Sequence, residues 1–378
     1  MLKSGSLITI RCFGFGFGFG FGLSLKLKGK NMHASPSSTV GKPLNFLLYV
    51  EQNYSFDILR PIQNEAIKQG HQVKWLVVGN DASEHFLHEN EQALASIEQA
   101  ISFKPDAVFV PGDRVPNFIP GIKVQVFHGL NESKRGNVYP ERGLFDLYCT
   151  EGPERTGTLT RSNKGHYNVV ETGWVKLDSL FQYQSTEHFD KPQVLFGSTF
   201  SASLSCAELV YEEVKRLSQN GSWQWLVTLH PKMAVSTVEK YKALESENLM
   251  FFENNQVIEA LYRADVMICD NSSIFQEFLL LNKPVVTVNN RDPLDCFINI
   301  TESDALEGAI KQALSPSPEL IDSIKKYGPS ITPYLDGKSS HRVVKAVEEM
   351  VGSNWVDKKP RNLLRNFKIR KKLNYWKF

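Results

Sequence analysis

Between residues 44 and 351, short apolar runs alternate with amphipathic stretches, and this alternation restricts the fold more than any other feature of the sequence. Such runs, bounded by stretches of helical period, are typical of parallel strands joined by helices. One series runs from residue 44 to about residue 182, and a second series starts at residue 193 after a polar segment. The pattern therefore predicts an α/β protein with parallel sheets.

Two similar halves joined by a polar linker indicate two facing Rossmann-like domains. We expect the active site in the interdomain cleft, because ligands of open parallel sheets bind at the carboxyl ends of the strands. In the first half we place a helix over residues 84–102 and a strand over residues 123–127. The expected segments are a low-complexity extension at 1–43, the N-terminal domain at 44–182, the C-terminal domain at 190–337, a C-terminal helix at 338–352 and a basic aromatic tail at 353–378.

The two ends of the chain are basic and its body is acidic. Residues 1–43 contain six basic and no acidic residues, and residues 353–378 contain nine basic residues and one acidic residue, although the whole chain carries a net charge of only +2. An acidic body is unsuited to general nucleic-acid binding, so we expect no nucleic-acid partner. In residues 353–378, basic residues alternate with aromatic and aliphatic ones, which favours contact with an anionic membrane. The alternative is a final helix docked on the body with a solvated basic face.

Several further features limit the class of protein. The repeat FGFGFGFGFG at residues 13–22 opposes a helix, and three interpretations stay open: translation that starts at Met32, a disordered extension, and a targeting segment. The five cysteines are far apart, which fits a reducing compartment. The chain has no Walker A loop and no GxGxxG after the first strand, which argues against a kinase, an NTPase or an NAD-dependent dehydrogenase. It also lacks metal-ligand spacing such as HExxH, and we expect no metal site. No apolar run reaches about 18 residues, and we expect no transmembrane helix.

Two histidines follow predicted strands. His128 comes directly after the strand at 123–127, and Gly129 permits a close approach of the backbone there. A neutral imidazole at this position can remove a proton from an attacking hydroxyl, and the alternative is a structural histidine in a loop. His230 ends the strand at 224–229, where it can donate a hydrogen bond to a phosphate, and Lys232 adds positive charge. We expect the two histidines to face each other across the cleft.

The densest motif is ADVMICDNSSIFQEFLLLNKPVV at residues 264–286. Its strand ends in Asp270, and Ser272 or Ser273 can cap the helix that follows, so that the helix N-terminus forms a phosphate site. Glu277 lies one turn further along, where its carboxylate can accept hydrogen bonds from ribose hydroxyls. The alternative is an ordinary N-cap with an exposed Glu. Asp113 could also reach the cleft, although we interpret it as a turn carboxylate. Lys134 and Arg135 either neutralise a diphosphate or form a solvated basic loop.

These motifs resemble, in order, those of the CDP-glycerol glycerophosphotransferase family, the teichoic-acid-type polymerases and primases. The similar segments are FHG at 127–129, LFGSTF at 195–200, LHP at 229–231, ADVMICDNSS with Glu277 and NKPVV at 264–286, and YLDGKSSHRV at 334–343. The sequence departs from the family pattern after His128, where Ser133 stands in place of a lysine. Some of these elements also resemble UDP-N-acetylglucosamine 2-epimerases.

The resemblance implies a GT-B-like architecture, with the acceptor on the N-terminal domain and the nucleotide donor on the C-terminal domain. It implies a metal-independent transfer of glycerol phosphate from CDP-glycerol to a hydroxyl of a surface polysaccharide or a lipid-linked acceptor, with release of CMP. His128 would be the base, His230, Ser272 and Ser273 would hold the diphosphate beside Asp270, and Glu277 would lie near the nucleotide. CDP-ribitol remains an alternative donor. A nucleotide-sugar glycosyltransferase or 2-epimerase and a non-catalytic polysaccharide-assembly protein are the alternative functions. We expect a cytoplasmic protein, peripheral on the inner face of the membrane.

Overall fold

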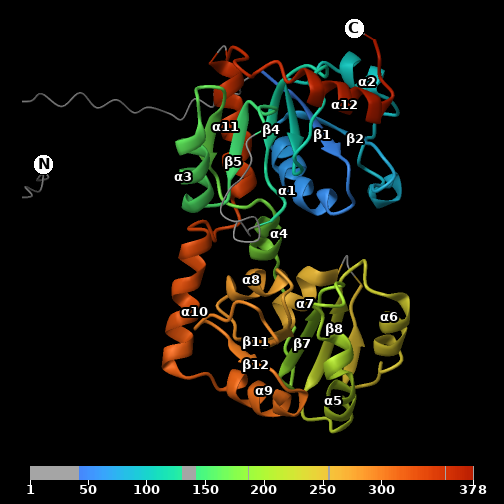
Figure 1. Cartoon of the computed structure of the whole chain (residues 1–378), viewed down its shortest axis with the longest axis vertical. Coiled ribbons are helices and arrows are strands. Elements are labelled where there is room, and N and C mark those ends of the chain that lie inside the picture. Colours follow the sequence, from blue (N-terminus) through green and yellow to red (C-terminus); the bar gives the residue numbers. More distant parts are fainter. Residues whose placement is uncertain (1–41, 130–141, 186, 254–255, 354, 378) are drawn as a thin grey trace, which may run out of the picture. The chain divides into compact units, whose positions relative to one another are not determined.

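Two parallel six-stranded sheets make up the fold (Figure 1). The computed structural model describes residues 42–129, 142–185, 187–253, 256–353 and 355–377. The sequence-based expectations for residues 1–41, and for Lys134 and Arg135, lie outside the described residues. Residues Pro43–Phe378 form one compact unit.

The first sheet has the strand order β2-β1-β3-β4-β5-β6, and all its pairs are parallel. Its strands are β1 (Asn45–Val50), β2 (Gln72–Val77), β3 (Ala107–Val110), β4 (Ile122–Gln125), β5 (Leu147–Thr150) and β6 (Asn168–Glu171). Its helices are α1 (Ser55–Lys68), α2 (Ile97–Ser102), α3 (Pro153–Ser162) and α4 (Lys176–Gln182), with a 3-10 turn at Glu84–Phe86.

The second sheet has the order β12-β11-β10-β7-β8-β9, again with parallel pairs. Its strands are β7 (Gln193–Ser198), β8 (Gln224–Leu229), β9 (Leu249–Phe251), β10 (Val266–Cys269), β11 (Val285–Val288) and β12 (Ile298–Ile300). Its helices are α5 (Ala207–Gln219), α6 (Val235–Lys242), α7 (Val257–Arg263), α8 (Ile274–Leu279), α9 (Leu306–Leu314) and α10 (Pro318–Ile331). In each sheet the buried strands are almost entirely apolar, as expected when helices cover both faces.

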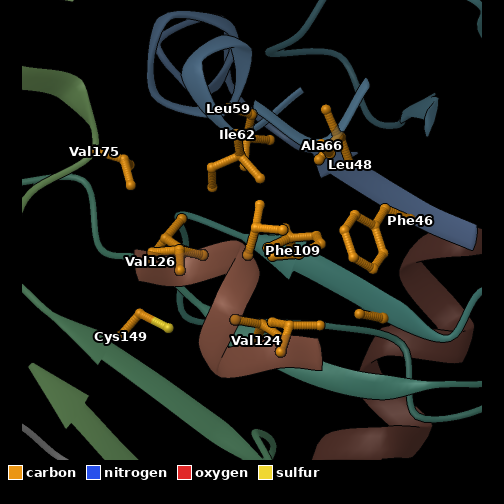
Figure 2. Packing of buried hydrophobic residues seen from close by; sticks show 14 of the residues in the cluster. Phe46, Leu48, Leu59, Ile62, Ala66, Phe109, Val124, Val126, Cys149 and Val175 are labelled. Atoms are coloured by element: carbon orange, nitrogen blue, oxygen red, sulfur yellow. The ribbon is translucent and has the colours of Figure 1, made fainter. Parts of the chain in front are cut away.

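The last two helices, α11 (Ser339–Gly352) and α12 (Leu363–Leu373), return to the first sheet. Val343, Val347 and Met350 of α11 belong to the same buried cluster as α1 and strands β1, β3, β4 and β5. Figure 2 shows Leu59 and Ile62 of α1 over Phe109 of β3 in that cluster. The helix that we place outside both domains therefore completes the core of the first sheet.

The structure corrects three local expectations. The helix expected at 84–102 is reduced to the short α2, because the backbone of Trp75 pairs with Gln92 and Leu94 and holds this segment along β2. Strand β4 ends at Gln125 rather than at residue 127, and Phe127 adopts a positive φ of 51°. The basic tail contains α12, whose Ile369 is buried in the core of the first sheet, as in the docked-helix alternative. Among the described residues, no helix is long and apolar enough to cross a membrane.

Candidate functional site

A cavity of about 370 Å³ lies at the carboxyl ends of strands β1, β3 and β4. Its wall comprises residues that follow these strands, including Glu51, Tyr54, Asp113 and His128, together with Arg142 before β5. The position is the one at which open parallel sheets bind their ligands, and the volume lies within the range of small-molecule sites. The expectation that His128 reaches a ligand pocket is therefore consistent with the geometry, and Asp113 lies in the same pocket.

The hydrogen bond of His128 defines the tautomer of its ring. Its Nδ1 lies 3.1 Å from the carbonyl oxygen of Pro111. A carbonyl only accepts, so Nδ1 carries the proton and a neutral ring keeps its lone pair on Nε2. The ring packs beside Tyr54, with 5.2 Å between the ring centroids, and the side chain is exposed. His128 therefore presents a proton acceptor at the cavity.

The backbone before His128 is held in a strained conformation. A φ of 51° is unusual for a bulky aromatic residue such as Phe127. Arg155, at the start of α3, lies over the Phe127 ring, 4.1 Å from its centroid, and donates to the carbonyl oxygen of Gly129 at 3.0 Å. The guanidinium is itself buried and paired with Glu151 at 3.0 Å. Arg155 thus fixes both sides of His128, and sequence reasoning missed it.

Acidic and basic groups are paired at the cavity. Glu51 accepts a hydrogen bond from the hydroxyl of Tyr49 at 3.0 Å and lies 3.7 Å from Arg114. Burial and the Glu51 carboxylate raise the pKa of Tyr49 well above its ordinary value, so this phenol stays protonated and keeps donating. Asp113 pairs with Arg142 at 2.9 Å. Carboxylates accept hydrogen bonds from hydroxyls and guanidinium groups bind phosphates, so the cavity offers partners for both.

Asp270 organises the corresponding edge of the second sheet. Its carboxylate is fully buried and accepts hydrogen bonds from the hydroxyl of Ser198 at 2.5 Å, and from the backbone N–H groups of Thr199, Cys206 and Ser272 at 2.9 to 3.2 Å. These donors come from the loops after β7 and β10. Asp270 therefore ties two strand-end loops together and does not point into open space.

His230 lies beside this group. Its backbone N–H donates to the carbonyl oxygen of Ser198 at 3.2 Å. Its Nδ1 accepts a hydrogen bond from the backbone N–H of Lys232 at 3.0 Å, which leaves the ring proton on Nε2. Partial burial, with a smaller contribution from Lys232, lowers the pKa of His230 below its ordinary value. His230 is thus a neutral donor at neutral pH, and its ring packs on Phe200 with 4.5 Å between centroids.

The expected serine cap is wrong in its detail. Ser273 is the N-cap of α8, but neither serine hydroxyl caps the helix. The carboxylate of Asp270 takes the N–H of Ser272 instead, because it is already fixed at the end of β10. Ser272 is half-buried and Ser273 is exposed, so both remain near the surface at the carboxyl edge of the sheet.

Glu277 is paired within the protein. Its carboxylate lies 2.5 Å from Nζ of Lys176, the first residue of α4, and the Glu277 side chain is 9% exposed. The same two groups act on Asp57, whose pKa is raised chiefly by burial. Sequence reasoning missed Lys176, which no motif marks. Any contact of Glu277 with a ligand must share the carboxylate with this lysine.

The described contacts bring Asp270, Ser272 and His230 together, since all three are linked through Ser198 or Asp270 itself. No contact among the described residues joins His128 to His230. The described part of the chain also contains no cluster of three or more His, Cys, Asp or Glu side chains placed to hold a metal ion. The four described cysteines are free and buried.

The segment YLDGKSSHRV at 334–343 has a structural role. Asp178 of α4 is buried and accepts the backbone N–H groups of Ser339 and Ser340 at 2.8 and 2.6 Å, so it caps α11. Gln182 donates to the carbonyl oxygen of Gly337 at 2.5 Å. Gly173 has a φ of 85°, and a Cβ there would lie 2.6 Å from the hydroxyl of Ser339. The segment therefore joins α11 to α4.

Comparison with solved structures defines the fold as GT-B-like. The wall teichoic acid polymerase TagF matches with a TM-score of 0.56 and 15% identity, over 84% of this chain and 91% of TagF. A UDP-N-acetylglucosamine 2-epimerase from Neisseria meningitidis, bound to UDP-GlcNAc, matches with a TM-score of 0.54 and 15% identity, over 81% of this chain and all of that chain. The expected fold class is thereby confirmed.

Sequence comparison then gives a match to a family. Residues 145–290 match the model of the CDP-Glycerol:Poly(glycerophosphate) glycerophosphotransferase family. The teichoic acid glycerol-phosphate primase of Bacillus subtilis (strain 168) is 25% identical over 225 residues, which cover 54% of this chain and 58% of the primase. The resemblance inferred from the motifs is confirmed for LFGSTF, LHP and ADVMICDNSS. The segments around His128 and Ser339 lie outside the matched residues.

Proposed function

We propose that the chain is a transferase that moves a glycerol-phosphate group from CDP-glycerol to a hydroxyl of a cell-surface polysaccharide or lipid-linked acceptor. The observation that carries the proposal is the tautomer of His128, which presents the lone pair of Nε2 at a charged cavity. The description of the family whose model matches residues 145–290 names CDP-glycerol, and this supports CDP-glycerol as the donor. A TagF variant has been soaked with CDPG, and its fold is similar to this one.

In the proposed reaction, the acceptor lies in the cavity and its hydroxyl loses a proton to His128. The acceptor oxygen forms a bond to the β-phosphorus of CDP-glycerol, and the bond from that phosphorus to the oxygen of CMP breaks. Positioned general bases contribute about 10²–10⁴ in rate. Gly129 allows the donor to approach His128 closely.

The second sheet is proposed to hold the donor. The neutral His230 donates from Nε2 to the diphosphate, and Lys232, Ser272 and Ser273 surround the same groups. Asp270 acts indirectly, since its buried carboxylate positions the loops that carry the proposed phosphate-binding residues. Glu277 binds the ribose, with Lys176 orienting its carboxylate. Preorganised donors of this kind stabilise charge as the leaving group departs.

One alternative rests on a specific observation. The fold is equally similar to that of 2-epimerases, so a nucleotide-sugar glycosyltransferase or 2-epimerase is the second candidate. A non-catalytic assembly protein is the third candidate, and it would still bind its partners or the membrane without His128. CMP release that requires an acceptor separates the first candidate from the other two.

The proposed location is the cytoplasmic side of the membrane, with peripheral attachment through residues 353–378. Its support is the composition of α12 and the residues around it, which combine basic groups with exposed Leu363, Leu364 and Phe367. Surfaces of this composition bind anionic bilayers.

The first test is a thermal-shift series with CDP-glycerol, CDP-ribitol, CMP, UDP and UDP-N-acetylglucosamine. A ligand at 100 times its Kd stabilises the folded state by about 2.7 kcal/mol. Stabilisation by CMP and CDP-glycerol, followed by CMP release only with acceptor, is the expected result. Stabilisation by the uridine ligands alone would move the assignment to the second candidate.

A further inference from the structure

Asn271 ties together three loops at the carboxyl edge of the second sheet. Its side-chain nitrogen donates to the carbonyl oxygens of Leu204 at 3.3 Å and Asn289 at 3.1 Å, which belong to the loops after β7 and β11. Its side-chain oxygen accepts the backbone N–H of Arg291 at 2.9 Å. A primary amide has two N–H donors and one carbonyl oxygen, so this half-buried side chain uses both donors and its oxygen within the protein. Asn271 therefore fixes the backbone at Arg291 against the loop after β7.

A second asparagine secures the same loop. The side chain of Asn290 donates to the carbonyl oxygen of Asp270 at 3.2 Å and accepts the backbone N–H of Asp292 at 2.9 Å. The backbone N–H of Asn290 donates to the side chain of Asn299, in β12, at 3.1 Å. The loop that carries Arg291 is thus bonded to the end of β10 and to β12, and the protein itself holds it in this shape.

The guanidinium of Arg291 is held at one point, although the residue is exposed. It donates to the carbonyl oxygen of Ser203, in the loop after β7, at 3.1 Å. A guanidinium carries five N–H donors in a planar fork, so donors remain for a phosphate, which such groups bind with two parallel hydrogen bonds. Arg291 is thus an oriented cation at the edge where open parallel sheets bind their ligands.

The contacts of Arg291 and Glu277 belong to opposite faces of the second sheet. Leu195 of β7 packs in the buried cluster that contains residues of α8, and its neighbour Phe196 packs in the cluster that contains residues of α5. Successive side chains of a strand point to opposite faces, so α8 and α5 cover different faces. Glu277 belongs to α8, whereas Ser203, which holds Arg291, lies in the loop that leads into α5. A nucleotide whose ribose is bound at Glu277 therefore reaches Arg291 by crossing the strand ends with its phosphates.

We propose that Arg291 is a further donor-binding residue that binds the second phosphate of the nucleotide, and that Asn271 is the positioning residue that holds it there. The inference rests on the proposed function and adds the group that recognises the phosphate under attack. His230 follows β8 and Arg291 follows β11, and β7 and β10 lie between these strands. Neighbouring strands are about 4.8 Å apart, so the two side chains start roughly 14 Å apart. They approach a diphosphate at the ends of β7 and β10 from opposite sides.

The second phosphate carries the bond that breaks in the proposed reaction. Its non-bridging oxygens are negatively charged and repel an incoming hydroxyl oxygen. A fixed guanidinium beside them neutralises this charge without having to reorganise. CMP has only the first phosphate, so the contact is present with CDP and CDP-glycerol and absent with CMP. Binding of these three ligands therefore reports on the contact without any acceptor.

The test measures the Kd of CMP, CDP and CDP-glycerol by isothermal titration calorimetry, without acceptor. Arg291→Ala removes the guanidinium, and Arg291→Lys keeps a single charge but not the planar fork. Arg216→Ala is the matched control, because the Arg216 side chain is 54% exposed and lies near the end of α5, away from the carboxyl edge. Its partners, Glu213 and Glu307, lie outside the loops that Asn271 joins.

Arg291→Ala is expected to weaken the binding of CDP and CDP-glycerol about 10- to 100-fold and to leave CMP binding unchanged, because only the second phosphate loses a partner. Arg291→Lys should recover part of the loss, and Arg216→Ala should change none of the three constants. Equal weakening of all three ligands, or no weakening, overturns the proposal. A loss confined to CDP-glycerol assigns Arg291 to the glycerol group and overturns it as well.

Asn271→Ala tests the positioning residue. The ratio of the Kd of CDP to the Kd of CMP is expected to rise severalfold, whereas a purely structural role would lower the thermal midpoint and leave this ratio unchanged. In the Arg291→Ala background, the same substitution should not change the ratio further. A ratio that still rises there shows that Asn271 acts independently of Arg291 and overturns its assignment as a positioning residue.

The result for Arg291 is separable from the result for the proposed function. If the unmodified protein binds UMP and UDP but none of the cytidine ligands, the proposed donor is wrong, and the same comparison is made with UMP and UDP. Selective loss of UDP binding in Arg291→Ala then still supports the site for the second phosphate, and equal loss of both ligands rejects it. An unmodified protein that binds neither pair of nucleotides overturns both proposals.

Discussion

The carboxyl edges of the two sheets are built differently although their strand patterns are alike. At the first edge, His128 is exposed beside a cavity in which charges are paired but reachable. At the second edge, the central charge of Asp270 is fully buried and accepts donors from both neighbouring loops. The first edge suits the proton transfer proposed for His128, and the second keeps loop backbones in place. Under the proposed function, this difference separates the catalytic group from the positioning group.

The largest effect is expected at the first edge. His128→Ala should lower the rate of CMP release by about 10²–10⁴, because the proton acceptor is lost. The thermal midpoint should stay the same, since the side chain is exposed. His188→Ala, another exposed histidine, is the control. An undiminished rate would exclude His128 as the base.

At the second edge, the loss is expected in stability. Asp270→Asn replaces an acceptor of several donors by a group that itself donates, so the free energy of unfolding should fall by about 2–4 kcal/mol. Urea denaturation measures it, with the exposed Asp304→Asn as control. A variant as stable as the parent would show that the buried carboxylate does not hold the loops.

A smaller effect should appear at Arg155. Arg155→Lys keeps the charge beside Glu151 but loses the flat group over Phe127 and the bond to Gly129, so kcat should fall about tenfold. Arg161→Lys, on the exposed side of the same helix, should have no effect. If KM rises and kcat does not, Arg155 contributes to acceptor binding rather than to the position of His128.

The smallest expected effect concerns the titration of His230. Because the pKa of His230 is lowered in the folded state, the unfolded chain binds a proton more readily. The free energy of unfolding should therefore decrease as the pH falls from about 6.5 through the lower pKa of the folded state. NMR of the imidazole nitrogens should show a midpoint below 6.5, and Lys232→Ala should raise it slightly. A midpoint above that of a free histidine would indicate a charged His230 and a different role at the diphosphate.

The sequence predicts most of the strands because a buried parallel strand needs a continuous apolar run, as in β8 and β10. It fails at residues 84–102, where backbone pairing with Trp75 overrides the helical pattern. It identifies Asp270 and the two histidines as strand-end residues, but it does not reveal the buried state of Asp270. Arg155, Lys176 and Asp178 act through contacts between residues distant in sequence, and no local pattern marks such residues.

The return of α11 to the first sheet has a consequence for synthesis. The core of that sheet contains Val343 and Val347, which are translated only after every strand of the second sheet. The second sheet and its helices occupy a continuous stretch and can condense as they leave the ribosome, whereas the first sheet must wait with an apolar face uncovered. The half of the molecule that is made first is therefore the half that is completed last, and during that interval it depends most on protection from aggregation.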